Sequence, residues 1–236
     1  MAKVLFVITA ANGWTLKDGT VHPTGYWAEE LAEPHRLFRA VGWDITLATP
    51  GAVPPTLDEF SLGMAGGLPS KRRAMREYLE SIRPQLESPL ALDVVDENDY
   101  DVVFYPGGHG PMEDLAFDGT SGELLKRRLE SGRPLALLCH APAAILAAKK
   151  ADGTNAFAGR KMTGLSNVEE RLNPFAWKAK WFLEDAVKAA GVEYSKALVP
   201  LRPFVVVDGN LYSGQNPQSA NALTERLLSD FPSGGR

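Results

Sequence analysis

Short uninterrupted apolar runs alternate along the chain with longer segments that place an apolar residue every three or four positions. Runs of this length are typical of strands buried on both faces of a parallel sheet. They cover residues 3–9, 43–49, 100–105, 135–138, 160–165, 199–207 and 211–213. Segments with helical spacing lie between them, at about 25–40, 70–87, 121–131, 140–150, 173–190 and 217–229. This alternation predicts an α/β fold, a mostly parallel sheet with helices on both faces.

The segments between these elements have turn and loop composition. Residues 50–69 are rich in proline and glycine, and a loop of this length often covers a site. Asp208-Gly209-Asn210 predicts a hairpin turn, which adds a small antiparallel piece near the end of the sheet. Residues 233–236 are expected to be a frayed tail.

Composition and charge narrow the functional classes. The 236 residues are 44% hydrophobic and 23% charged, as expected of a globular protein with a full core. The net charge of −4 gives no electrostatic reason to expect nucleic acid or an anionic membrane surface as a partner. No apolar run approaches the ~20 residues of a membrane span. A single cysteine excludes an internal disulfide and fits a cytoplasmic location.

That cysteine stands where the apolar run 135–138 ends. Cys139 is followed by His140 and by Pro142, which is tolerated in the first turn of a helix. We therefore expect a tight turn from strand to helix, with free N–H groups that lower the thiol pKa and stabilise an oxyanion. The alternative is that Cys139 is a buried small hydrophobic residue.

Glu30 is an acid inside the apolar stripe of the helix predicted at 25–40. A carboxylate on the inner face of a helix is unfavourable unless it is partnered or protonated. Glu30 therefore either reaches water from the edge of the stripe or is a carboxylic acid of a site at the centre of the sheet.

Two further strand ends carry candidate chemistry. Residues 106–111, Pro-Gly-Gly-His-Gly-Pro, are either a backbone oxyanion site or a plain tight turn. They lack the lysine and hydroxyl residue of a phosphate loop. Glu169 and Glu170 follow the run 160–165; they are either first-turn helix acids, or one of them orients a histidine.

Four motifs occur in an order that resembles a known family. They are Gly25-x-x-x-x-Glu30 with Pro34, residues 105–110 (YPGGHG), residues 138–142 (LCHAP) and residues 213–217 (SGQNP). Together they resemble the PfpI-like branch of the class I glutamine-amidotransferase-like superfamily. Within it the chain is most similar to the glutathione-independent glyoxalase III proteins, which are also described as heat-shock chaperones.

The resemblance implies a flavodoxin-like fold and a role for each matched residue. Cys139 would be the nucleophile, and His140 the general acid/base. Glu170 would be the acidic partner of His140, with Glu169 as the nearest competitor. Glu30 would be protonated and would hydrogen-bond the thiolate. The N–H groups of Gly108 and His140 would bind an oxyanion, and His109 would line the pocket.

The implied reaction is that of a glyoxalase III lyase, which converts methylglyoxal to lactate through a cysteine hemithioacetal. It needs neither glutathione nor a redox cofactor, and the family default is a homodimer that acts on small aldehydes such as methylglyoxal or glyoxal. Some relatives bind zinc, but the histidines of this chain show no close spacing to acids, so no metal is predicted. Trp14, Phe175 and Trp177 are expected to wall the pocket.

Residues 50–90 match the family poorly. They are expected to be a variable insertion that shapes substrate entry within one domain spanning 1–236. Four alternative functions remain open. They are a cysteine peptidase or amidase, a glutaminase module, a stress chaperone, and a protein deglycase.

Overall fold

The computed structural model describes residues 1–232, so the tail predicted at 233–236 lies outside the described residues. Within them, seven strands form the central sheet, in the order β10-β11-β7-β6-β1-β4-β5. Their bounds are β1 Lys3–Val7, β4 Asp44–Thr49, β5 Leu90–Ala91, β6 Val102–Tyr105, β7 Leu135–Leu138, β10 Val205–Asp208 and β11 Leu211–Gly214. Neighbouring strands are parallel except for the β10–β11 hairpin at one edge, which confirms the predicted fold class.

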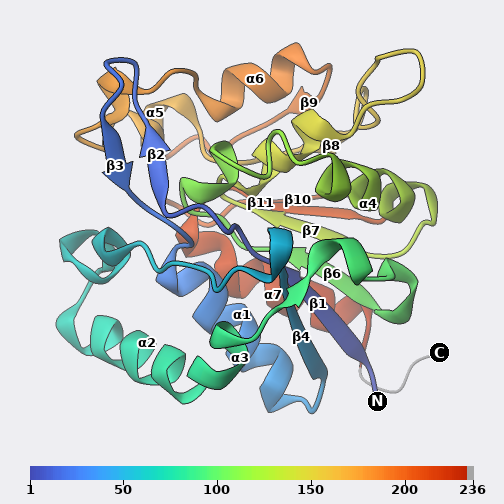
Figure 1. The fold of residues 1–236 in the computed structure, drawn as a ribbon, viewed down its shortest axis with the longest axis horizontal. Helices are drawn as coiled ribbons and strands as arrows, with labels where there is room; N and C mark the ends of the chain where they lie inside the picture. Colours follow the sequence, from blue (N-terminus) through green and yellow to red (C-terminus); the bar gives the residue numbers. More distant parts are fainter. Residues whose placement is uncertain (233–236) are drawn as a thin grey trace.

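Helices cover both faces of this sheet (Figure 1). One face packs against α1 Ala28–Ala40, α2 Pro69–Ser81, α3 Arg83–Glu87 and α7 Ala220–Asp230. The other packs against α4 Gly119–Glu130, α6 Leu183–Ala189 and the 3₁₀ helix η7 Ala141–Ala147. In β1, Val4 and Phe6 point to the first layer while Leu5 and Val7 point to the second, as the two-residue period of a strand requires.

Several segments differ from the sequence-based expectation. The run at 160–165 does not join the central sheet; only β8 Lys161–Met162 is a strand, and it pairs with β9 Glu193–Tyr194. The residues after β8 instead pass over the carboxyl ends of β11 and β7. There Thr163 N–H donates to Ser213 Oγ, and Leu165 N–H donates to Cys139 O. Residues 163–165 therefore contact the cysteine turn and β11 instead of pairing as a strand of the central sheet.

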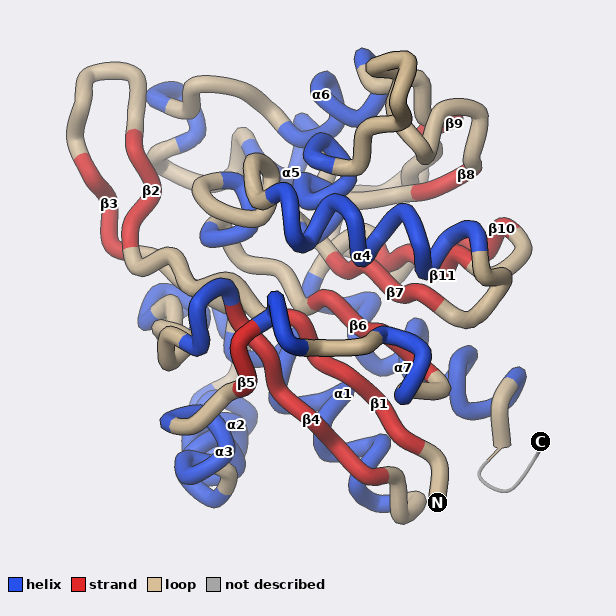
Figure 2. Tube along the Cα trace, turned by 45° about the vertical axis from the view of Figure 1, so that its right-hand side comes forward, coloured by secondary structure: helices blue, strands red, loops and turns tan. Residues whose placement is uncertain are grey.

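The loop after β1 also contains more structure than its polar sequence indicates. β2 Gly13–Thr15 and β3 Val21–Pro23 pair as an antiparallel hairpin apart from the central sheet (Figure 2). The helical region at 173–190 is broken into η8 Ala176–Lys178 and α6. The remaining short helices are η1 Pro50–Ala52, η2 Glu59–Leu62, η3 Met64–Gly66, η4 Leu92–Val94, η5 Glu97–Asp99, η6 Gly110–Met112, α5 Asn167–Glu170 and η9 Pro217–Ser219.

The helix predicted after Cys139 is a 3₁₀ helix that ends at Ala147 rather than at Lys150. Its end lies close to α4, since a Cβ added at Gly122 would lie 2.4 Å from the carbonyl oxygen of Ala147. The absence of a side chain at Gly122 therefore lets the backbone of α4 approach the end of η7.

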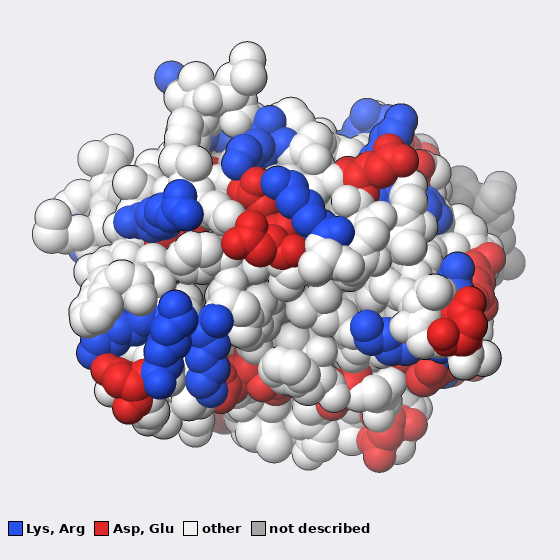
Figure 3. All heavy atoms as spheres, turned by 90° about the horizontal axis from the view of Figure 1, so that it is seen from above, with Lys and Arg blue, Asp and Glu red and all other residues white. Residues whose placement is uncertain are grey.

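The surface agrees with the charge balance of the sequence. On the face seen in Figure 3, basic side chains lie among acidic ones rather than forming a continuous basic surface. The helices of residues 1–232 are all too short or too polar to span a bilayer.

Candidate active site

Cys139 lies at the carboxyl end of β7, on the expected tight turn. Its φ of +59° is the left-handed conformation, which is strained for a residue other than glycine. Neighbouring segments hold this conformation from both sides: Cys139 N–H donates to Gly214 O and Cys139 O accepts from Leu165 N–H, both at 2.9 Å. The surrounding sheet therefore fixes the direction of the thiol.

His140 and Glu170 stand in line with that thiol. Nδ1 of His140 lies 3.5 Å from Cys139 Sγ, and Nε2 lies 2.6 Å from Oε2 of Glu170. An ionised carboxylate can only accept a hydrogen bond, so His140 Nε2 carries a proton and Nδ1 is free to take one. The geometry thus supplies a nucleophile, a base and a group that orients the base.

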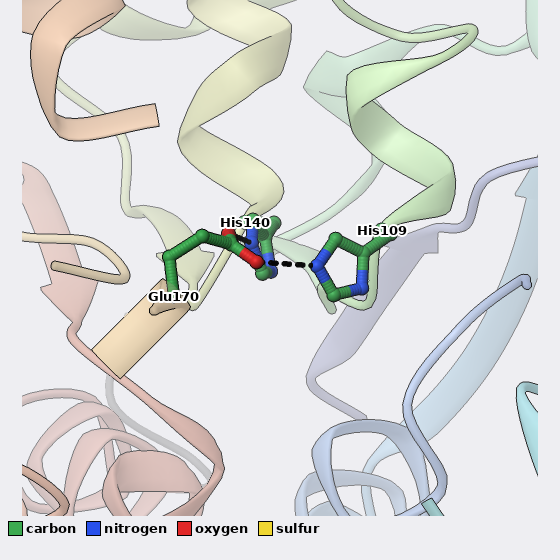
Figure 4. A group of neighbouring side chains, drawn as sticks. All are labelled: His109, His140 and Glu170. Carbon is green, nitrogen blue, oxygen red and sulfur yellow. Dashed lines mark hydrogen bonds and ion pairs between the residues drawn. The ribbon is translucent and has the colours of Figure 1, made fainter. Parts of the chain in front are cut away.

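A second imidazole shares the same carboxylate. His109 Nε2 lies 2.9 Å from Oε1 of Glu170, and the two imidazole rings are 4.2 Å apart between centroids. In Figure 4, one carboxylate oxygen of Glu170 points toward His109 and the other lies against His140. Glu170 therefore accepts two hydrogen bonds at once.

The three groups shift one another's pKa values. Burial would raise the pKa of Glu170, but the charges and hydrogen bonds of His109 and His140 hold it well below its usual range. Burial alone would lower the pKa of His109, yet Glu170 outweighs it and raises that pKa. Burial and the neighbouring His109 lower the pKa of His140, so the site favours a neutral His140 beside the thiol.

Glu30 reaches the same point from α1, fully buried. Its Oε2 accepts a hydrogen bond of 2.8 Å from Gly107 N–H, and its Oε1 has no partner among residues 1–232. Burial raises the pKa of Glu30 to about 8, and the adjacent Cys139 partly opposes that rise. Of the two positions left open by the sequence, the structure places Glu30 at the centre of the sheet.

The expectation that the turn lowers the thiol pKa is wrong for this site. Burial, and next the Glu30 carboxylate, raise the pKa of the Cys139 thiol well above its ordinary value. The free N–H groups of a short 3₁₀ helix do not offset a desolvated sulfur beside an acid. A thiolate forms here only when Glu30 is protonated or when His140 accepts the thiol proton.

Glu169 points away from the histidines and binds the scaffold. Its carboxylate accepts hydrogen bonds from the side chains of Ser166, Gln215 and Asn216 and from the N–H of Leu201. Sequence reasoning missed this role of Gln215 and Asn216, although both lie in a motif that had been noted. Glu169 thus anchors α5, from which the adjacent Glu170 reaches the imidazoles.

The glycine turn after β6 packs directly on the cysteine turn. A Cβ added at Gly107 would lie 2.8 Å from the N of His140, and Gly108 has a φ of +103°. Neither Gly108 N–H nor His140 N–H donates a hydrogen bond within the described chain. Two free amides at the mouth of the turn are suited to an oxyanion.

A cavity of about 270 Å³ opens above these groups. Its floor holds Cys139, His140, His109 and Glu170, and its walls include Asp58, Phe60, Ala65, Leu172, Phe175 and Leu201. Of the three aromatic residues expected to wall the pocket, Phe175 lines it and Trp14 stacks on His109 behind it. Trp177 is 73% exposed and takes no part in the wall.

His109, His140 and Glu170 are a donor set of the kind that holds zinc, with ligand atoms within 4.8 Å of one another. Sequence spacing gave no sign of this cluster, because the three residues come from different elements. Tetrahedral zinc would separate its ligand atoms by about 3.3 Å. The contacts of 2.6 and 2.9 Å are shorter and are hydrogen bonds, so the residues as arranged do not fit the metal.

Comparison with known families agrees with the resemblance read from the motifs. The family model described as the DJ-1/PfpI family matches residues 22–230. The chain belongs to the DJ-1/PfpI family.

Among characterised relatives, the chain is similar to proteins with two kinds of name. It is 25% identical to "Glutathione-independent glyoxalase hsp3101" of Schizosaccharomyces pombe, over 96% of this chain and 94% of the relative. It is 26% identical to "Glyoxalase 3" of Candida albicans, over 98% and 99%. It is 25% identical to "Protein/nucleic acid deglycase HchA" of Staphylococcus aureus, over 97% and 80%.

The crystal structure of glyoxalase III from Candida albicans has the same fold, with a TM-score of 0.81 at 24% identity over 98% of this chain and 97% of that one. These likenesses indicate an enzyme of the glyoxalase or deglycase kind.

Proposed function

We propose that the protein is a glutathione-independent glyoxalase that converts methylglyoxal, or a similar small aldehyde, to the corresponding hydroxy acid. The observation that supports this most is the line of contacts from Cys139 Sγ through His140 to Glu170, at the floor of a cavity. The names of the relatives at full-length similarity support the same class of reaction.

In the proposed reaction, the Cys139 sulfur adds to the aldehyde carbon while His140 Nδ1 takes the thiol proton. The addition creates an oxyanion, which the N–H groups of Gly108 and His140 stabilise until His140 Nδ1 passes the thiol proton to it and the neutral hemithioacetal forms. Proton transfer between the two carbons gives a lactoyl thioester, and water hydrolyses it to lactate. Protonated Glu30 donates to the sulfur whenever it carries negative charge.

The proposal also covers the cellular compartment of the enzyme, the role of residues 50–90 and its partners. A free thiol at the centre of the site fits a reducing compartment such as the cytoplasm. We propose that residues 50–90 are a variable segment within one domain and that they shape substrate entry, which is supported by the contribution of Asp58, Phe60 and Ala65 to the cavity wall. The homodimer and the absence of a nucleic-acid partner stay predictions of the sequence.

The test is lactate formation from methylglyoxal without added glutathione. Wild type is expected to turn over, and Cys139→Ala is expected to be inactive. Glu170→Gln should lose about 10³–10⁴-fold in kcat, because the imidazole loses its orienting charge. Glu169→Gln is the matched control, expected to lower stability while kcat falls by less than about tenfold. No lactate from wild type would refute the proposal.

A deglycase is the second candidate, favoured by the similarity to HchA. The same nucleophile would act on an aldehyde already bonded to a protein or nucleotide amine. The two activities can be distinguished by measuring lactate release from two substrates, free methylglyoxal and preformed hemiaminal adducts of methylglyoxal with amines. An added scavenger removes the amines that the adducts release. Release from adducts that outpaces their spontaneous dissociation would favour the deglycase.

A further inference from the structure

The conversion proposed above requires proton transfer at two carbons and at two oxygens of the substrate. One proton leaves the carbon bonded to sulfur and arrives at the neighbouring carbon. Another must reach the oxygen of that neighbouring carbon, and one must leave the oxygen of the first. His140 faces the sulfur through Nδ1 at 3.5 Å, which suits the transfer between carbons. The oxygens need a second group.

His109 has the geometry of such a group. It holds Glu170 through Nε2 at 2.9 Å, lines the same cavity as Cys139, and is only 8% exposed. Its other nitrogen, Nδ1, makes no hydrogen bond to any residue in 1–232. The hydrogen bond to Glu170 therefore fixes the ring and leaves one nitrogen free for a ligand.

The surroundings of His109 favour its protonated form. Glu170 lies against one edge of the ring, and the Trp14 indole stacks on it with centroids 4.3 Å apart and planes at 24°. An indole face attracts a cation. Asp58 adds a favourable charge and His22 an unfavourable one, while Asn173 Nδ2 lies 3.4 Å from Nε2.

We propose that His109 is a second acid/base residue of the site, which exchanges protons with the two substrate oxygens while His140 moves the proton between the carbons. This inference rests on the proposed glyoxalase function. It assigns the two imidazoles that share Glu170 to two different transfers.

The steps balance in atoms and electrons. From the hemithioacetal, His140 removes the proton of the sulfur-bonded carbon, and His109 gives a proton to the ketone oxygen, which forms an enediol. His140 then returns its proton to the second carbon, and His109 takes the hydroxyl proton of the first. The first carbon is oxidised to a thioester as the second is reduced to an alcohol. Both histidines return to their starting states.

The experiment uses His109→Gln, whose amide can still donate to Glu170 but cannot exchange protons. Two quantities are measured: lactate formation from methylglyoxal, and the rate at which iodoacetamide alkylates Cys139. The second reports the thiol and its base without the later transfers. We expect kcat for lactate to fall about 10²–10⁴-fold, while alkylation does not fall by more than about threefold, because loss of His109 removes a group that lowers the pKa of His140.

A pH profile adds a readout that a merely structural role would not move. Because Glu170 raises the pKa of His109, wild-type kcat should fall as pH rises through that pKa. The variant should lose the alkaline limb that His109 causes, while the limb caused by Glu30, whose pKa is raised to about 8, should remain in both proteins. His109→Asn serves if the glutamine variant does not fold, and a Trp14→Leu variant should shift the alkaline limb to lower pH.

The outcomes separate the inference from the proposed function. Turnover by wild type together with a kcat within about threefold in His109→Gln would refute the role of His109 and leave the glyoxalase intact. Parallel losses of lactate formation and alkylation would also refute it, because His109 would then only position His140. No turnover by wild type would refute the glyoxalase itself, and the inference with it.

Discussion

Replacing Glu30 with glutamine tests the claim that this carboxyl group is protonated in the folded protein. The side chain is fully buried, and the folded state raises its pKa from 4.5 to about 8. At about 1.4 kcal/mol per pH unit, that rise corresponds to about 5 kcal/mol of preference for the neutral form. Glutamine keeps the shape and has no proton to lose.

The sign of the effect follows from proton uptake on folding. Between pH 4.5 and about 8 the folded state keeps the Glu30 proton while the unfolded chain releases it. The stability contribution is therefore fully present below pH 4.5 and is lost as pH rises through about 8. Relative to wild type, Glu30→Gln should gain about 4 kcal/mol in free energy of unfolding between pH 5 and pH 8.

The assay is urea denaturation at pH 5, 6, 7 and 8, carried out in a Cys139→Ala background so that the thiol does not titrate. Loss of the thiol can only raise the pKa of Glu30 further, because the thiol opposes the rise. Glu33→Gln is the control for removing one carboxyl group from the same helix. A difference that stays within about 1 kcal/mol across this range would refute the reasoning, since Glu30 would then ionise freely while buried.

Three further substitutions test the packing around the site. Gly107→Ala adds a methyl within 2.8 Å of Leu138 O, Glu30 Oε2 and His140 N, so lactate formation should fall more than about tenfold, whereas Gly119→Ala meets nothing within 4 Å and should match wild type. Arg128→Met removes a fully buried donor from four carbonyl oxygens, two of them in buried hydrogen bonds, and urea denaturation should show a loss of about 3–5 kcal/mol; a loss below about 1 kcal/mol would contradict this. Asn216→Ala removes a donor 2.7 Å from the Glu169 carboxylate and should cost about 2 kcal/mol in the same assay; an unchanged midpoint would show that water replaces the amide.

The sequence carried the fold class and the family, both of which the structure and the comparisons confirm. Glu30 could be singled out because an acid in an apolar stripe violates the helical pattern. The prediction of a sheet strand at 160–165 was wrong because a short apolar segment has the same pattern whether it pairs in a sheet or passes over the ends of its strands.

The contacts within the site could not be predicted from the spacing of residues along the sequence. His109 and His140 follow the neighbouring parallel strands β6 and β7, and Glu170 reaches both from α5, so no interval along the chain encodes their meeting. The high pKa of the thiol also depends on what surrounds it: the turn and the nearness of Glu30 were predicted, but not that burial would outweigh the free N–H groups of the turn.

The hydrogen bonds that pin Cys139 come from residues synthesised after it, at Leu165 and Gly214. During synthesis on the ribosome, Cys139 therefore emerges well before β11, the strand that pairs with β7. Until residue 214 is in place, the Cys139 turn lacks one of the two hydrogen bonds that hold its left-handed backbone. Iodoacetamide should consequently alkylate Cys139 faster in fragments that end before residue 214 than in the finished fold.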